Sequence, residues 1–260
     1  MSEQESAPDG GGPVVYVYGL VPADVEVKED ATGIGSPPRP LKTVTHDDVA
    51  ALVSEIDPDA PLGSSDDLRT HAAVLDATAT VAPVLPLRFG AVLTDTDAVV
   101  AELLEPYRDE FHEALEQLEG MVQFVVKGKY VEDAILREVL SEEPEAGRLR
   151  DAIRDKPEDA TRDERLALGE LISRAFTGKR EQDTRRIVEA VEPVAAAVSA
   201  REPTDDEGAG SVAVLISADR AEELDEAVAP LIDDWQGRVD VTVTGPLAAY
   251  DFVKTRAPGT

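Results

Sequence analysis

The segment 212–243, VAVLISADRAEELDEAVAPLIDDWQGRVDVTV, decides the fold class of this chain. Val212 to Ile216 is a continuous apolar run, Ala221 to Asp234 carries apolar residues at helical spacing, and Val239 to Val243 alternates apolar with polar residues. These patterns predict a buried strand, an amphipathic helix and a half-buried strand. A further strand is predicted at Met121 to Lys127 (MVQFVVK), after the break at Gly120. Strands and helices therefore mix within one domain.

Between these strands, the residues from about 130 to 200 read as helical stretches that are interrupted near Pro144, Pro157 and Gly178. The polar run TDDEGAG, residues 204–210, is typical of a solvated linker. We therefore predict a C-terminal α+β domain over residues 121–260, with a helical insertion at about 130–200.

The N-terminal half shows a second α+β pattern. The sequence predicts a flexible leader over residues 1–13 and a domain over 14–120. The predicted strands of this domain lie at 14–20, 41–45, 50–56 and 84–89, and a proline- and glycine-rich loop lies at 22–40. Its helices are predicted after residue 64 and over 94–119. Ser64 or Ser65 can cap the first helix, because two acidic residues follow in its first turn. Pro106 should bend the second helix.

The net charge of −29 comes from 54 acidic and 25 basic residues, of which only 7 are lysines. Such a surface repels itself at ordinary ionic strength and is screened in molar salt, where the Debye length is about 3 Å. We therefore expect a halophilic, acidic protein. The alternative, an acidic surface that attracts a basic partner, is less favoured because the acidic residues are spread along the chain. The same balance of charge argues against binding of nucleic acid.

The N-terminal sequence MSEQESAPDGGGP lacks the basic start and apolar run of a signal peptide. No stretch approaches the roughly 18 apolar residues that cross a bilayer. We therefore expect a cytoplasmic protein that does not bind a lipid membrane. The chain has no cysteine, which excludes disulfides, zinc ribbons and cysteine nucleophiles.

Residues that could carry catalysis are few. His46, His71 and His112 lie far apart, and none has a partner at the spacing of metal ligands. His71 is placed at the exposed side or edge of its helix and is interpreted as a hydrogen-bonded structural residue. No phosphate-binding or calcium-binding loop is present. The sequence therefore predicts no catalytic, metal or cofactor-binding residue.

Two other stretches stand out. In VAPVLPLRFG, residues 81–90, an arginine lies within an apolar strand, so Arg88 is expected to be buried and paired, or else to be a docking residue at a domain boundary. In TGPLAAYDFV, residues 244–253, a strand is expected to end, turn and return with Tyr250 and Phe252 on one face, packed against a helix.

Together these stretches resemble the signatures of the gas vesicle protein F/L family. The first strand (YVYGL, 16–20), the block DVAALVS (48–54) and the helix with His71 are similar too. The motif residues are Leu85, Pro86, Arg88, Phe89, Gly90, Gly245, Pro246, Tyr250 and Phe252. The chain departs from the family at Leu247-Ala248-Ala249, where an aromatic residue and prolines are common. Its length and acidic middle favour an L-type over an F-type member.

The resemblance implies two α+β domains, the second a modified ferredoxin-like fold with associated long helices. It also implies a non-catalytic role in early vesicle assembly, through contact with the small hydrophobic shell protein and other accessory proteins. An aliphatic helical stripe could cover the shell protein: Ile187, Val191, Val194 and Val198, with a second stripe at Leu168, Ile172 and Phe176. Either stripe could instead face the protein's own core. The alternatives are a minor structural subunit of the vesicle wall and a small-molecule-binding enzyme on a ferredoxin-like scaffold.

Overall fold

The computed structural model describes residues 12–203 and 207–253. Most of the predicted leader, residues 1–11, and the start of the predicted linker, residues 204–206, lie outside the described residues. The chain is a mixed α+β protein, as the sequence predicts. It forms two compact units: residues up to 122 together with 246–253, and residues 123–245. The sequence placed residues 246–253 with the second domain, whereas their contacts group them with the first unit.

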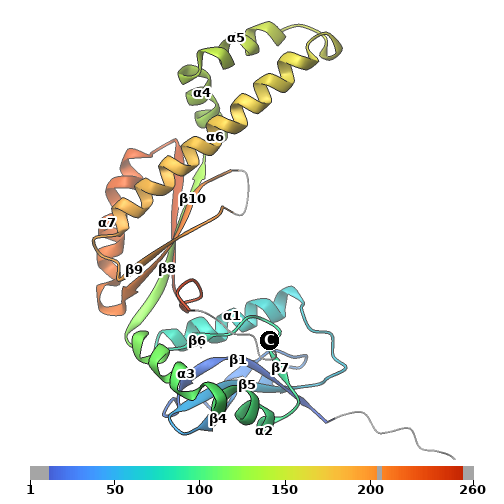
Figure 1. Ribbon diagram of the computed structural model, residues 1–260, viewed down its shortest axis with the longest axis vertical. Coiled ribbons are helices and arrows are strands. Elements are labelled where there is room, and N and C mark those ends of the chain that lie inside the picture. Colours follow the sequence, from blue (N-terminus) through green and yellow to red (C-terminus); the bar gives the residue numbers. More distant parts are fainter. Residues whose placement is uncertain (1–11, 204–206, 254–260) are drawn as a thin grey trace, which may run out of the picture. The chain divides into compact units, whose positions relative to one another are not determined.

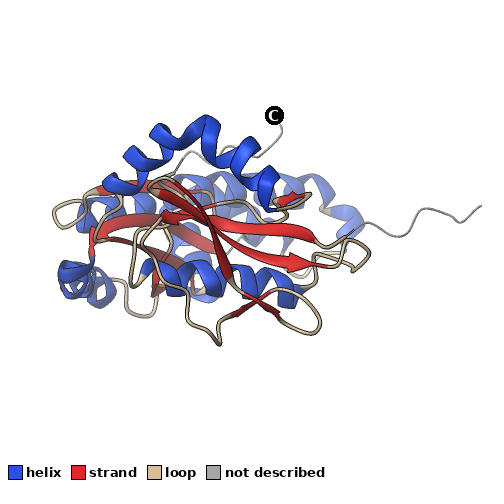
Figure 2. Cartoon of the chain, turned by 90° about the horizontal axis from the view of Figure 1, so that it is seen from below, coloured by secondary structure: helices blue, strands red, loops and turns tan. Residues whose placement is uncertain are grey.

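The first unit is built on a strongly buried antiparallel sheet, whose strands are the red ribbons in the foreground of Figure 2. Its path is β4-β5-β1-β6, and β7 also pairs with β1. The bounds are β1 (Val14–Pro22), β4 (Lys42–His46), β5 (Val49–Ile56), β6 (Leu85–Pro86) and β7 (Val92–Leu93). The predicted strand at 84–89 is therefore shorter than expected. The predicted loop at 22–40 also holds two short paired strands, β2 (Thr32–Gly33) and β3 (Arg39–Pro40).

Helix α1 (Ser65–Ala79) begins where the sequence indicates. Ser64 is its N-cap, the Ser64 side chain accepts a hydrogen bond from the backbone N–H of Asp67, and the Asp67 carboxylate accepts one from the backbone N–H of Ser64. This reciprocal capping box satisfies two backbone donors that a helix start leaves free. Helix α1 packs against β1.

The second helical segment of this unit is divided, as Pro106 predicts. It consists of α2 (Thr96–Ala98), the π-helical turn η1 (Val99–Leu104) and α3 (Glu105–Gln117). Tyr107 has non-helical backbone angles (φ −124°, ψ 15°), so the helix is kinked directly after the proline. Both η1 and α3 pack against β5.

The second unit contains a four-stranded sheet of order β11-β8-β10-β9, with bounds β8 (Met121–Tyr130), β9 (Ala197–Arg201), β10 (Gly208–Ser217) and β11 (Val239–Leu247). Between β8 and β9 lie the helices α4 (Glu132–Glu142), α5 (Pro144–Ile153) and α6 (Arg162–Val191), with the turn η2 (Glu158–Ala160) before α6. Between β10 and β11 lie the turn η3 (Ala218–Arg220) and helix α7 (Ala221–Asp234). The observed succession is βαββαβ, whereas the ferredoxin-like prediction came from the family resemblance. That assignment stays a prediction.

Helix α6 is a single helix of 30 residues that crosses the sheet, with α7 beside it (Figure 1). Gly178 does not interrupt it, contrary to the sequence-based expectation. The helical region also ends earlier than expected, because residues 197–201 pair with β10 as strand β9. Val198 lies opposite Val214 in this pairing. Tertiary pairing therefore overrides the local helical pattern at the end of the insertion.

Candidate functional site

A chain of hydrogen bonds joins three of the stretches that the sequence singled out. The Tyr16 hydroxyl of β1 lies 2.8 Å from His71 Nδ1 of α1, and the Gly90 N–H donates to the same hydroxyl oxygen at 3.2 Å. On the far side of the ring, His71 Nε2 lies 3.2 Å from the carbonyl oxygen of Leu87. Because a carbonyl only accepts, Nε2 carries the ring proton, and Nδ1 accepts from Tyr16. His71 is therefore held as the neutral imidazole.

The surroundings of His71 are apolar and aromatic. His71 is 4% exposed and Tyr16 is 0% exposed, so the prediction that His71 lies on the exposed side of the helix is wrong. The interpretation as a hydrogen-bonded histidine agrees with the geometry. The Phe89 ring lies 5.8 Å from Tyr16 and 5.6 Å from His71, centroid to centroid. Burial lowers the pKa of His71, since an apolar site disfavours the imidazolium. We call Tyr16, His71, Phe89 and Gly90 the histidine cluster.

Arg88 points away from this cluster. Leu85, Pro86 and Leu87 are buried, but Arg88 is exposed, and its side chain makes no ion pair or hydrogen bond within the part of the chain that the structure describes. The prediction of a buried, paired arginine is therefore wrong. Strand β6 ends at Pro86, and the Leu87 N–H still donates to the Tyr18 carbonyl of β1 at 2.9 Å, but Arg88 lies beyond the strand. Gly90 follows with φ +95°, a backbone conformation that favours glycine.

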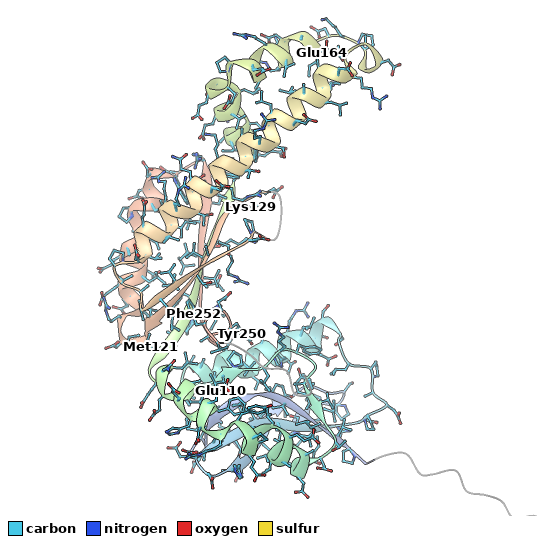
Figure 3. All side chains as sticks on the ribbon, in the orientation of Figure 1. Glu110, Met121, Lys129, Glu164, Tyr250 and Phe252 are labelled. Carbon is cyan, nitrogen blue, oxygen red and sulfur yellow. The ribbon has the colours of Figure 1, made fainter. Side chains whose placement is uncertain are left out.

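Of the C-terminal motif residues, Gly245 and Pro246 lie in β11, and Tyr250 and Phe252 lie in the turn after it, not on a returning strand. Strand β11 continues through Gly245 and Pro246, and the chain then turns through Tyr250 and Phe252, both labelled in Figure 3. The Tyr250 N–H donates to the carbonyl of Ala248 at 2.8 Å. The prediction of a returning strand is therefore wrong.

This turn is attached to α1 through Ala248, while the expected packing of Tyr250 and Phe252 against a helix stays a prediction. The Ala248 N–H donates to Asp76 Oδ1 of α1 at 2.9 Å, and the Ala248 side chain belongs to the same core as Tyr16 and Leu75. Burial raises the pKa of Asp76, and the hydrogen bond from Ala248 opposes this. Sequence reasoning missed Asp76, because an acidic residue is unremarkable in a chain with 54 of them.

The proposed partner stripe is not one helical face, because Ile187 and Val191 lie on α6, Val194 lies in the turn after it and Val198 lies on β9. Ile187 and Val191 are both 0% exposed, while Val194 and Val198 are half-buried. Helix α6 lies so close to β10 that a side chain at Gly210 would meet Ile187 Cδ1 at 3.1 Å. The expectation that this stripe is a docking face is therefore wrong for Ile187 and Val191. The alternative interpretation, packing into the protein's own sheet, is confirmed for these two residues.

The second unit also holds a partly buried ion network that the sequence did not reveal. The carboxylate of Asp183, on α6, accepts from the Tyr130 hydroxyl at 2.8 Å and from Arg238 at 2.9 Å. Arg238 also donates to Glu138 of α4 at 2.6 Å, and Lys179 pairs with the same carboxylate. Despite burial, hydrogen bonds from Arg238 and Lys179 lower the pKa of Glu138. Because the opposite charges pair with one another, the network links α4, α6 and the chain before β11 structurally.

Within residues 12–203 and 207–253, no three His, Asp or Glu side chains are grouped so that they could hold a metal ion. No helix there has the length and apolar character needed to cross a membrane. The chain is thus an α+β protein in which the histidine cluster connects β1, α1 and the segment 85–90.

The chain belongs to a known family: the model of the gas vesicle synthesis protein GvpL/GvpF family matches residues 14–254. Gas vesicle protein F of Streptomyces sp. (strain CB03234) is 33% identical over 242 residues, which are 92% of this chain and 99% of that protein. Gas vesicle protein L of the same strain is 39% identical over 126 residues, 43% of this chain and 46% of that protein. Because both kinds of relative match, the L-type assignment stays a prediction.

The fold agrees with a solved structure. The crystal structure of the gas vesicle protein GvpF from Anabaena sp. PCC7120 superposes with a TM-score of 0.76, at 24% identity, over 94% of this chain and 99% of that chain. At this identity the likeness shows the fold alone.

Proposed function

We propose that this protein is a non-catalytic accessory protein of gas vesicle assembly. It binds the small hydrophobic shell protein and other accessory proteins during early vesicle formation, in the cytoplasm and at the growing gas vesicle. The observation that carries this proposal is the family match over residues 14–254, since relatives matched along their whole length are named gas vesicle proteins.

The structure supports a binding role rather than chemistry. The neutral His71 is used for hydrogen bonds to Tyr16 and Leu87, and the charges around Asp183 are used in ion pairs. A shell subunit that must expose apolar surface to gas aggregates in water before it assembles. A partner with a net charge of −29 would give such a complex a highly charged surface, which favours its solubility.

A minor structural subunit retained in the vesicle wall is the second candidate. Both roles require contact with the shell protein, and they differ in what happens after assembly. The protein should be removed from purified vesicles by washing if it acts only in assembly, and it should remain there if it is a wall subunit. The third alternative, an enzyme that binds a small molecule, would need a pocket with converging catalytic groups, whereas the polar side chains of the histidine cluster and of the ion network are engaged with one another.

The test is co-purification in molar KCl. The tagged full-length protein is expressed with the shell protein and recovered from a high-salt lysate, and light scattering then measures aggregation of the shell protein with and without it. We expect a soluble complex and slower aggregation without added nucleotide. An unrelated acidic protein of similar charge is the control. Absence of the shell protein and of every other gas vesicle protein from the eluate would refute the proposal.

A further inference from the structure

The first unit has a surface groove of about 670 Å³ that none of the sequence motifs indicated. Three segments form it: the chain that leaves β1, the loop that follows α1, and the C-terminal half of α3 with the turn after it. Its volume lies in the range of ligand-binding clefts, about 300–1,000 Å³. The histidine cluster does not line it.

The apolar part of the groove is open to solvent. It is lined by Pro22, Val25, Val81, Pro83 and Leu115. Val81 is 82% exposed, while Leu115, which lines the groove from α3, is 3% exposed. A valine this exposed stabilises nothing in the isolated protein, but it would lose contact with water if a partner covered it.

Carboxylates surround this apolar strip, and they differ in whether they are paired. Asp48 is bound by Arg108 at 2.5 Å, and His112 Nδ1 lies 2.9 Å from it. By contrast, Asp24, Glu26 and Glu119 have no ion-pair partner within residues 12–203 and 207–253.

The groove therefore concentrates negative potential beside apolar side chains. His112 is the one basic residue among its lining residues, and it faces Asp48 and Glu116. Three carboxylates at its border are free to receive cations. Asp24, Glu26 and Glu119 are exposed, and they line the same hollow as Val81 and Pro83.

We propose that this groove binds a basic amphipathic segment of a partner protein. Lysine or arginine side chains of the segment pair with Asp24, Glu26 and Glu119, and its apolar side chains cover Val81 and Pro83. Charge complementarity identifies the occupant, because an acidic or purely apolar segment would leave these carboxylates desolvated and unpaired. The inference rests on the proposed function for the identity of the partner, which is then another gas vesicle protein.

The first experiment uses a fluorescent peptide of about 15 residues with leucines at i, i+3, i+4 and i+7 and lysines elsewhere. Anisotropy measures its Kd for the full-length protein in about 0.5 M KCl, after circular dichroism has shown that each variant is folded. The groove variant is Asp24→Asn, Glu26→Gln, Glu119→Gln. We expect its Kd to rise about tenfold, because three exposed charge contacts are lost.

The matched control removes the same three charges elsewhere, from exposed positions of α7: Glu222→Gln, Asp225→Asn, Glu226→Gln. We expect less than about a twofold change in its Kd. Val81→Ser should weaken binding without changing the net charge. Equal weakening by the two triple variants would show that net charge alone attracts the peptide, and it would overturn the proposal. So would an unchanged Kd in the groove variant.

A second experiment separates this inference from the proposed function. Co-purification of gas vesicle proteins is compared between the wild type, the groove variant and the control variant. Loss of a partner in the groove variant alone supports the inference. Full recovery of every partner by the groove variant would refute partner binding at the groove and leave the proposed function unchanged. Peptide binding at the groove, without recovery of any gas vesicle protein, would support the groove as a binding site and refute the proposed function.

Discussion

Replacing Tyr16 by phenylalanine isolates the hydrogen bonds of the histidine cluster from its packing. The ring stays in place, and only the hydroxyl that lies 2.8 Å from His71 Nδ1 and accepts from the Gly90 N–H is removed. Because Tyr16 is fully buried, the change creates no new contact with solvent. The Tyr16→Phe variant therefore measures what the hydrogen-bond chain contributes to stability.

The magnitude follows from which partner is left unsatisfied. Gly90 is exposed, so its N–H can bond to water instead. His71 is 4% exposed, and its Nδ1 would become a buried acceptor without a donor. Such a group costs about 1–3 kcal/mol of the free energy of unfolding. For a chain of this size, that corresponds to a fall in Tm of roughly 3–10 °C.

The assay is thermal unfolding followed by far-ultraviolet circular dichroism in molar KCl. Tyr250→Phe is the matched control, because the Tyr250 hydroxyl makes no hydrogen bond within the part of the chain described by the structure, and the residue is 38% exposed. Its Tm should stay within about 1 °C of the wild type. Amide hydrogen exchange over residues 85–90 gives a local reading, since the Gly90 N–H loses its acceptor and should exchange faster.

Two results would contradict this prediction. One is a Tm of Tyr16→Phe equal to that of the wild type, and the other is an equal fall in Tm for Tyr16→Phe and Tyr250→Phe. The first result would mean that His71 has another partner or turns toward solvent. The second would mean that the loss comes from the change of residue type and not from the hydrogen bonds of the histidine cluster.

The remaining predictions use the same melting assay. The free energy of unfolding should decrease as the pH falls below about 6.5, because the pKa of His71 is lowered in the folded protein and the unfolded chain therefore takes up the proton at a higher pH. The decrease should be smaller in His71→Gln, and a decrease as large as that of the wild type would contradict this prediction. Tm should rise steeply from low salt to molar KCl, because screening relieves the charge of −29, and a flat profile would remove the halophilic interpretation. Ile187→Asp should unfold the second unit, while Ile232→Asp, at a 43% exposed position, should leave the circular dichroism spectrum unchanged; similar spectra would contradict the packing of α6. Arg88→Ala should keep Tm within about 1 °C, since the side chain is exposed, and a large fall would show a buried partner.

The sequence alone determined the features that depend on neighbouring residues. The start of α1 depends on local residue types: the sequence predicts a cap at Ser64 or Ser65, and Ser64 forms it, in a capping box with Asp67. The kink after Pro106 follows from a missing N–H and a steric clash. The mixed α and β pattern, and the strands at 14–20, 41–45 and 50–56, follow from periodicity.

Tertiary structure decided which side of each element is covered. His71 was expected at an exposed edge, but the segment 85–90 folds over α1 and buries it. Arg88 was expected inside, but the strand ends two residues earlier. The stripe at Ile187 and Val191 is equally apolar whether it faces a partner or β10, so periodicity could not choose between them.

The groove and the ion network lay beyond sequence reasoning for the same physical reason. Asp24, Val81 and Glu119 form one surface only because β1, α1 and α3 meet in space. Asp183 and Arg238 lie far apart in the chain and pair only once the second unit has folded. In a chain with 54 acidic residues, the charge of a residue does not reveal its role. The side chains that surround it do, and only the tertiary structure brings them together.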